Sequence, residues 1–257
     1  MNIYQHFRVE EHSFIDHVME WKDGVIAQYS PKLTDFLDPR EQQILSSVIG
    51  QDSEVNYVCF GGSEYVERKR ALIFPSFYEP REEDFQIALY AINYPQKFVK
   101  IEHPQVLGSL MGIGLKRGKF GDILIKDGIV QVVIASEVAN FVLMNLESIG
   151  KSKVSLEPLQ LKEIIQVQEQ WIEEICTVSS LRLDVIVAEA FNLSRTKSLP
   201  YIQGGHTKVN WKHVEEISFE CKEGDMISVR GNGRVKILQI EGKTKRDKWK
   251  LLIGRIK

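Results

Sequence analysis

The chain has 257 residues, of which 43% are hydrophobic and 26% charged, the composition of a soluble globular protein large enough for two or three domains. No apolar run reaches the roughly 18 residues that a membrane helix needs. The first residues lack the apolar core of a signal peptide, so we expect a cytoplasmic protein without a membrane span. Three scattered cysteines, Cys59, Cys176 and Cys221, argue against both a disulfide framework and a zinc site.

Charge is distributed unevenly along the chain. Residues 179–257 hold 16 Lys and Arg against 9 Asp and Glu, a net charge of +7, whereas residues 1–178 hold 17 against 26, a net charge of −9. A basic segment attracts phosphate and releases counterions when it binds nucleic acid. A solvated basic surface without a partner fits the charge count equally well.

The first segment, residues 1–66, is predicted to be an α-rich N-terminal domain. Apolar residues recur at helical spacing from Glu10 to Tyr29. Asp38-Pro39 has the residue types of an N-cap and a first helical position, so a second helix should begin there and end near Gly50. The apolar run Val55–Phe60 predicts a strand that follows the two helices.

The second segment, residues 67–160, is predicted to be a sheet with helices on one face. Its elements are expected in the order strand, strand, helix, strand, strand, helix, strand, and a ferredoxin-like sandwich, as in RNA-recognition modules, is one candidate. Lys126-Asp127-Gly128 has the turn chemistry of a tight hairpin. The expected strands cover residues 70–74, 85–94, 122–125, 129–134 and 154–159, and the expected helices cover residues 103–113 and 135–149.

A loop in this segment combines four glycines, at positions 112, 114, 118 and 121, with three cations. Glycine allows a backbone to approach a phosphate closely, and cations can bind it. The spacing fits neither a Walker motif nor a dinucleotide fingerprint. Two interpretations stay open, a nucleic-acid contact and a connecting loop that needs glycine for its turns. The candidate residues are Lys116, Arg117 and Lys119.

Residues 161–178 are predicted to link the middle segment to a C-terminal domain, residues 179–257. Apolar periodicity predicts a short helix from Leu183, and Ser194 has the residue type of an N-cap for a second helix that ends at Gly204-Gly205. Pro200 lies inside this second helix, where a proline removes a hydrogen bond at a cost of roughly 3 kcal/mol, so we expect a kink near residues 196–198.

The basic residues of the C-terminal domain are the main candidates for binding nucleic acid. Arg195 and Lys197 fall in the first turn of the second helix, where backbone N–H groups and cations suit a phosphate; solvent-facing charge is the alternative. Arg182 could instead pair with Asp184. The candidates are Arg182, Ser194, Arg195, Thr196, Lys197, Lys208, Asn210, Lys212, Arg230, Arg234, Lys245 and Arg246.

Two strand-like runs, residues 233–240 and 248–256, predict a terminal hairpin rich in lysine and arginine. Trp249 lies among these cations and could stack on a base. Alternatively, Trp249 belongs to the core and the lysines protect the edge of a sheet.

The run RLDVIVAEAFNLSRTKSLPYIQGGHTKVNW, followed by CKEGDMISVR, resembles the small RNA-binding domain first described in bacterial ribosomal protein S-four, the S4-type domain. Across the rest of the chain, PKLTDFLDPREQQIL, HPQVLGSLMGIGLKRGKFGDI and SEVANFVLMNLESIGKSKV are similar to the YlmH proteins of Gram-positive bacteria.

The resemblance implies an α+β protein of three small domains: an N-terminal one, an RNA-recognition-like middle one, and a C-terminal S4-type domain of two helices and a β-hairpin. It also implies binding of structured RNA, ribosomal RNA or tRNA, on the large ribosomal subunit. The family is linked to cell division and to the handling of stalled large-subunit complexes.

The sequence carries no recognisable catalytic constellation. Its six histidines lack metal-ligand spacing, and no nucleophile elbow is present. We therefore expect no catalytic residue, metal or cofactor. Three functions stay open: a non-enzymatic RNA-binding protein, an RNA-modifying enzyme delivered by the S4-type domain, and an adaptor whose acidic N-terminal domains bind a protein partner.

Overall fold

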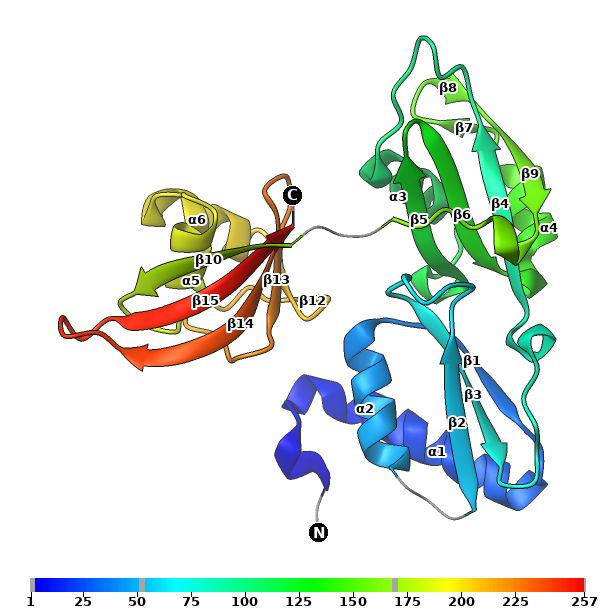
Figure 1. Cartoon of the computed structure of the whole chain (residues 1–257), viewed down its shortest axis with the longest axis horizontal. Coiled ribbons are helices and arrows are strands. Elements are labelled where there is room, and N and C mark those ends of the chain that lie inside the picture. Colours follow the sequence, from blue (N-terminus) through cyan, green and yellow to red (C-terminus); the bar gives the residue numbers. More distant parts are fainter. Residues whose placement is uncertain (1–2, 51–53, 168–170, 257) are drawn as a thin grey trace. The chain divides into compact units, whose positions relative to one another are not determined.

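The computed structural model describes residues 3–50, 54–167 and 171–256 (Figure 1). The chain forms two compact units, Met1–Val167 and Gln168–Lys257. Besides the helices and strands given below, short 3-10 helices cover Ile3–His6, Val9–Glu11, Glu82–Phe85, Arg117–Lys119, Ser136–Val138 and Leu161–Glu163.

The first unit begins with two helices that pack against a small antiparallel sheet of strand order β1-β3-β2. Asp38 caps the second helix as predicted, because its carboxylate accepts the N–H of Glu41 while the Glu41 side chain accepts the N–H of Asp38. The elements are α1 (His12–Gln28), β1 (Lys32–Leu37), α2 (Pro39–Ile49), β2 (Val55–Phe60) and β3 (Lys69–Pro75).

Two features of this sheet differ from the sequence prediction. No strand was predicted where β1 lies. Strand β3 was expected to open the middle domain, but it pairs with both β1 and β2 and so belongs to the N-terminal sheet. The division at residue 66 is therefore wrong for this strand. A strand's sheet is set by its hydrogen-bonding partners, which lie far away in the sequence.

The second sheet of this unit has the strand order β5-β6-β4-β9, with every pair antiparallel. With one helix after its first strand and one after its third, this is the predicted ferredoxin-like arrangement. Asp127 and Gly128 both have positive φ, 51° and 83°, as a two-residue type I′ hairpin turn requires. The elements are β4 (Ile87–Asn93), α3 (His103–Gly112), β5 (Phe120–Lys126), β6 (Ile129–Ala135), α4 (Ala139–Asn145) and β9 (Ser155–Leu159).

The helix expected over residues 135–149 is shorter than predicted. It is confined to α4, and the residues after it form a small hairpin of β7 (Ser148–Ile149) and β8 (Ser152–Lys153). Gly150, at φ 60°, lies in the hairpin turn rather than at a helix end.

The C-terminal unit is one six-stranded antiparallel sheet of order β10-β15-β14-β13-β11-β12, with two helices against one face. Leu183 and Ile186 of the first helix pack on Val235 and Leu251 of the sheet. The elements are β10 (Trp171–Val178), α5 (Leu183–Ala190), α6 (Arg195–Gln203), β11 (Thr207–Val209), β12 (Lys212–His213), β13 (Met226–Val229), β14 (Gly233–Lys243) and β15 (Trp249–Ile256).

The expected linker over residues 161–178 is wrong in its second half. Strand β10 pairs with β15 from Trp171 to Val178 and forms one edge of the C-terminal sheet. The predicted terminal hairpin is present as β14 and β15, and Pro200 lies inside α6, which continues through it to Gln203.

Candidate nucleic-acid interface

The start of α6 presents unpaired cations beside free backbone donors. Ser194 caps the helix, and its Oγ accepts the N–H of Lys197 at 3.3 Å. The side chains of Arg195, Thr196 and Lys197 are exposed, and in the described part of the chain no hydrogen bond or ion pair holds the side chain of Arg195 or Lys197. The first turn of a helix also leaves backbone N–H groups without helical partners. This end of α6 can therefore accept an anion.

The two helices are fixed relative to each other by polar contacts that the sequence left undecided. Arg182 Nε donates to Asp184 Oδ1 at 3.0 Å, so the ion-pair interpretation of these residues is the one found. The Asp184 side chain is buried and that of Arg182 is half exposed. Buried Ser198 of α6 joins the two helices, because its Oγ donates to the carbonyl of Asp184 in α5 at 3.3 Å, and it also donates to the carbonyl of Arg195 at 2.9 Å. Arg182 thus orients the start of α5, and Arg195 projects from a rigid turn.

The helix-free face of the C-terminal sheet carries further cations. Val209, Val229 and Val235 point into the core, so their strand neighbours point to the opposite face. In the register Lys208 lies opposite Ser228, and Ser228 opposite Arg234, which places the two cations in one row across three strands. The other predicted cations of this sheet are the exposed Arg230, directly after β13, and the half-buried Lys212, on the edge strand β12.

Asn210 has a structural role that the sequence did not reveal. Its Nδ2 donates to Asp225 Oδ1 at 2.7 Å, and its Oδ1 accepts the N–H of Met226 at 2.9 Å. Its φ is 49°, a value that asparagine tolerates better than most residues. Both ends of its amide group are therefore used inside the protein, where Asn210 closes a turn.

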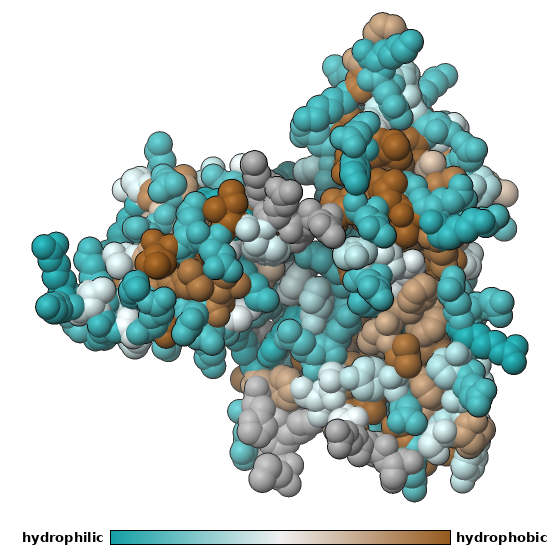
Figure 2. All heavy atoms as spheres, in the orientation of Figure 1, coloured by the Kyte–Doolittle hydropathy of each residue, from teal (hydrophilic) through white to brown (hydrophobic). Residues whose placement is uncertain are grey.

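The β14–β15 hairpin ends in exposed Lys245 and Arg246, and Figure 2 shows only hydrophilic side chains at its tip. Trp249 packs against the core, as one of the two interpretations expected. Lys243 Nζ lies 5.5 Å from the Trp249 ring centroid and 2.7 Å from Asp247 Oδ1. With one side on the core and a cation over the ring, Trp249 is poorly placed to stack on a base.

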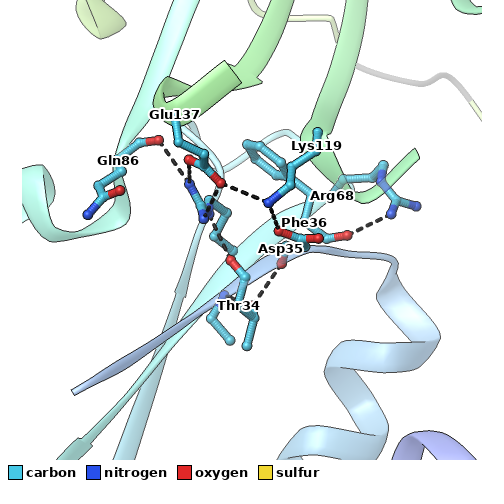
Figure 3. Close-up of polar contacts among 9 residues, drawn as sticks. Thr34, Asp35, Phe36, Arg68, Gln86, Lys119 and Glu137 are labelled. Carbon is cyan, nitrogen blue, oxygen red and sulfur yellow. Dashed lines mark hydrogen bonds and ion pairs between the residues drawn. The ribbon is translucent and has the colours of Figure 1, made fainter. Parts of the chain in front are cut away.

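The glycine-rich loop of the middle domain does not present its cations to solvent as a group. Lys119 Nζ lies 2.6 Å from Asp35 Oδ1 and 3.0 Å from Glu137 Oε1 (Figure 3). Arg117 Nη1 donates to the carbonyls of Phe120 and Gly121, and burial followed by the charge of Arg68 lowers the Arg117 pKa to about 10. Lys116 alone is exposed. Arg117 and Lys119 therefore make contacts within the fold, which favours the connecting-loop interpretation over a nucleic-acid contact.

The glycines of this loop do permit a close approach, but the neighbour is strand β1. A Cβ on Gly118 would lie 3.1 Å from Asp35 Cβ, and a Cβ on Gly121 would lie 2.9 Å from Phe36 Cε1. Ordinary side chains cannot pack at such distances without displacing their neighbours. The glycines at positions 118 and 121 are therefore needed for the close packing of this loop on β1.

Arg70, which was not among the residues predicted from the sequence, is the centre of the junction between the two sheets; its partners Thr34, Gln86 and Glu137 are labelled in Figure 3. It is 3% exposed, and its guanidinium binds both carboxylate oxygens of Glu137, at 3.0 and 3.2 Å. It also donates to the carbonyls of Thr34, at 2.8 Å, and Gln86, at 3.0 Å. One side chain thus joins β1, β3 and β4 to the turn after β6.

The carboxylates of the junction have shifted pKa values. Burial raises the pKa of Glu137, but hydrogen bonds from Arg70 and Lys119 outweigh it, so the net pKa is lowered. Asp122 accepts the N–H groups of Glu67 and Arg68 at 2.6 and 3.1 Å, and burial nevertheless raises its pKa. These interactions hold the N-terminal and middle sheets together as one unit.

Part of the helix-free face of the ferredoxin-like sheet is covered. In RNA-recognition modules this face carries aromatic side chains on which bases stack. Here it carries Leu89, Val133 and Ala135, which pack against Phe36 and against residues 161–164. Gln131 on the same face is 3% exposed and pins that segment by donating to the Glu163 carbonyl and accepting the Ile165 N–H. The covered part of this face therefore has no room for a stacked base.

Other chemistry finds no support in the described ranges. No group of three or more His, Cys, Asp or Glu side chains there could hold a metal ion. Burial raises the pKa of the Cys59 and Cys176 thiols to about 11, which disfavours a nucleophilic thiolate. No helix within those ranges is long and apolar enough to cross a membrane.

The fold and its exposed cations define an α+β protein in two units, with a C-terminal module of two helices and a sheet that suits nucleic acid. Comparison with known families agrees. Residues 10–78 match the family model "YlmH, N-terminal", residues 80–163 match "Putative RNA-binding domain in YlmH", and residues 181–227 match "S4 domain". The chain therefore belongs to the YlmH family.

Two relatives extend this comparison. The chain is 48% identical over 257 residues to "Ribosome-associated protein quality control protein P2" of Bacillus subtilis (strain 168), a match that covers all of this chain and 99% of the relative. A solved structure, "Cell division protein ylmH from Streptococcus pneumoniae", matches with a TM-score of 0.55 and 33% identity, over 64% of this chain and all of that one.

Proposed function

We propose that the protein is a non-enzymatic factor that binds structured RNA, ribosomal RNA or tRNA, on the large ribosomal subunit, in ribosome quality control. The observation that carries the proposal is the pair of exposed, unpaired cations, Arg195 and Lys197, at the capped start of α6. The name of the Bacillus subtilis relative supports the ribosomal setting. The name of the Streptococcus pneumoniae structure leaves cell division as the second setting in which to look for a phenotype.

The start of α6 would bind one RNA phosphate. The partial positive charge of a helix N-terminus and two cations act on the same anion. Lys208 and Arg234, in a row on the sheet, with Arg230, Lys212 and the hairpin residues Lys245 and Arg246, would bind further phosphates. Contacts of this kind recognise the shape of a folded RNA more than its sequence.

The test is a double charge reversal, Arg195→Glu with Lys197→Glu, in the full chain. Binding to purified large ribosomal subunits and to deacylated tRNA would be measured over a salt series. We expect affinity to fall tenfold or more, because hydrogen bonds between charged groups are worth about 1.5–3 kcal/mol. The slope of log affinity against log salt should flatten by roughly 0.9 for each phosphate that is no longer neutralised.

The matched control reverses two exposed lysines of the first unit, Lys32→Glu with Lys162→Glu, and so changes the net charge equally. Its affinity should stay near that of the unchanged protein. Equal losses in the two double variants would mean that only net charge matters, and the α6 site would have to be abandoned. Mass analysis of RNA modifications with and without the protein tests the enzymatic alternative.

A further inference from the structure

Three loops that have no role in the function proposed above lie together at one end of the ferredoxin-like sheet. The β4–α3 loop, the β5–β6 turn and the β7–β8 hairpin all lie at this end, because Asn93 pairs with Ser155 and Lys126 with Ile129 (Figure 1). The N-terminal sheet packs at the other end, where Gly121 and Gln86 lie. We call this end of the sheet the distal end, formed by Lys97, Phe98, Lys100, Lys126, Lys151 and Lys153.

Phe98 is the most exposed large hydrophobic side chain in the described ranges, at 87%. Phe98 lies in a turn that two hydrogen bonds close. The carbonyl of Pro95 accepts the N–H groups of Phe98 and Val99 at 3.0 and 3.1 Å. The Tyr94 hydroxyl donates to the carbonyl of Gly128 at 2.7 Å and fixes this loop to the β5–β6 turn. Because the Phe98 ring lies in solvent, its apolar surface contributes no burial free energy to the stability of the fold.

Lysines lie on both sides of Phe98 in the sequence. Lys97 and Lys100 flank it in the same loop, and both are exposed. The nearest paired acid is Glu102, whose carboxylate lies 3.7 Å from Lys100 Nζ with both side chains in solvent, so the pair is weak. The end as a whole holds five lysines, at positions 97, 100, 126, 151 and 153, against Glu102, Asp127 and Glu147. Figure 2 shows hydrophobic atoms at the tip of this end beside hydrophilic side chains.

An exposed aromatic ring between lysines is the chemistry that binds an unpaired base and its phosphates. The covered part of the helix-free face of the same sheet offers no such ring. We propose that the distal end is a second RNA contact, at which Phe98 stacks on an unpaired base and Lys97 and Lys100 bind the flanking phosphates. This proposal rests on the RNA-binding function proposed above and adds a contact on the other unit of the chain. Two linked contacts on one RNA raise its overall affinity.

The test is Phe98→Ala in the full chain, with binding measured to deproteinised large-subunit ribosomal RNA and to intact large subunits. Base stacking on an aromatic ring predicts a loss of roughly five- to a hundredfold in affinity, without a change in salt slope. Phe98→Trp should keep the affinity. Lys97→Ala with Lys100→Ala should flatten the salt slope by up to about 1.8. Phe77→Ala is the matched control, since Phe77 is also exposed, at 68%, and lies outside the distal end.

The outcomes separate this proposal from the preceding one. If Phe98→Ala binds both RNA probes normally while the α6 double reversal does not, the distal contact is wrong and the α6 site stands. If Phe98→Ala weakens binding but the α6 reversal has no effect, the distal contact stands alone. A Phe98→Ala defect confined to phosphatidylserine vesicles would identify a membrane-binding tip and overturn the RNA contact.

Discussion

The loop around Lys116–Lys119 and the start of α6 are alike in sequence and opposite in structure. Each has closely spaced cations beside residues that expose backbone N–H groups. In the loop, Lys119 is neutralised by Asp35 and Glu137, and Arg117 is buried against carbonyls. At α6, Arg195 and Lys197 reach solvent with no such partner among the described residues.

The difference lies in distant residues. Asp35 is 84 positions from Lys119, so no local pattern could reveal that this lysine is engaged. A cation that holds two sheets together contributes to stability, whereas a solvated cation can bind a phosphate. The comparison therefore makes a separable prediction: variants of the loop and its junction should change stability, and variants at α6 should change RNA affinity.

The largest effect is expected from Arg70→Ala, at the centre of the junction. The substitution removes the buried partner of Glu137 and takes a donor away from two carbonyls. Breaking a fully buried ion pair costs about 3–5 kcal/mol, and the loss here should approach the lower end of that range, because Arg70 is buried but Glu137 is partly exposed. Urea unfolding of the first unit would measure the loss. Arg195→Ala is the control, since an exposed cation of α6 should change stability by less than about 0.5 kcal/mol.

A smaller effect is expected from Lys119→Ala, which removes one cation from two carboxylates. We expect a loss of about 1–2 kcal/mol in unfolding free energy, because the ion pairs are partly exposed. Affinity for large ribosomal subunits should not change. A weaker RNA affinity with unchanged stability would contradict the structural role and restore the loop as a binding site.

The loss of stability in Lys119→Ala should also depend on pH. The pKa of Glu137 is lowered in the folded protein, so its ionised form contributes stability above its ordinary pKa of 4.5. That stability is lost as the pH falls through the lowered value. The difference between the unchanged protein and Lys119→Ala should therefore be complete near pH 7 and shrink in acid below about pH 4.5.

The smallest effect is expected from Ser194→Ala, which removes the cap of α6. Loss of a serine N-cap costs about 1 kcal/mol, and the cap here accepts one N–H at 3.3 Å. Hydrogen exchange of the first turn of α6 should become faster. RNA affinity should fall by less than in the Arg195→Glu, Lys197→Glu variant, because the cations that bind the phosphate remain. An equal fall would show that the cap itself orients the site.

Features that depend on neighbouring residues could be predicted from the sequence alone. Asp38-Pro39 and Ser194 cap their helices, Asp127-Gly128 makes a hairpin turn, and the order of helices and strands predicts the ferredoxin-like sheet. Turn and cap preferences act over two to four residues, so they can be read locally. The S4-type match rests on the same kind of ordered, local landmarks.

Only the tertiary structure showed which strands pair and which side chains make contacts within the fold. It assigned β3 and β10 to their sheets, covered part of the ferredoxin-like face with Phe36 and residues 161–164, and used Asn210 and Lys119 as internal contacts. It also left Phe98 in solvent, although phenylalanine is ordinarily a core residue. Burial and ion pairing depend on partners brought together from distant parts of the chain, and a linear pattern does not contain those partners.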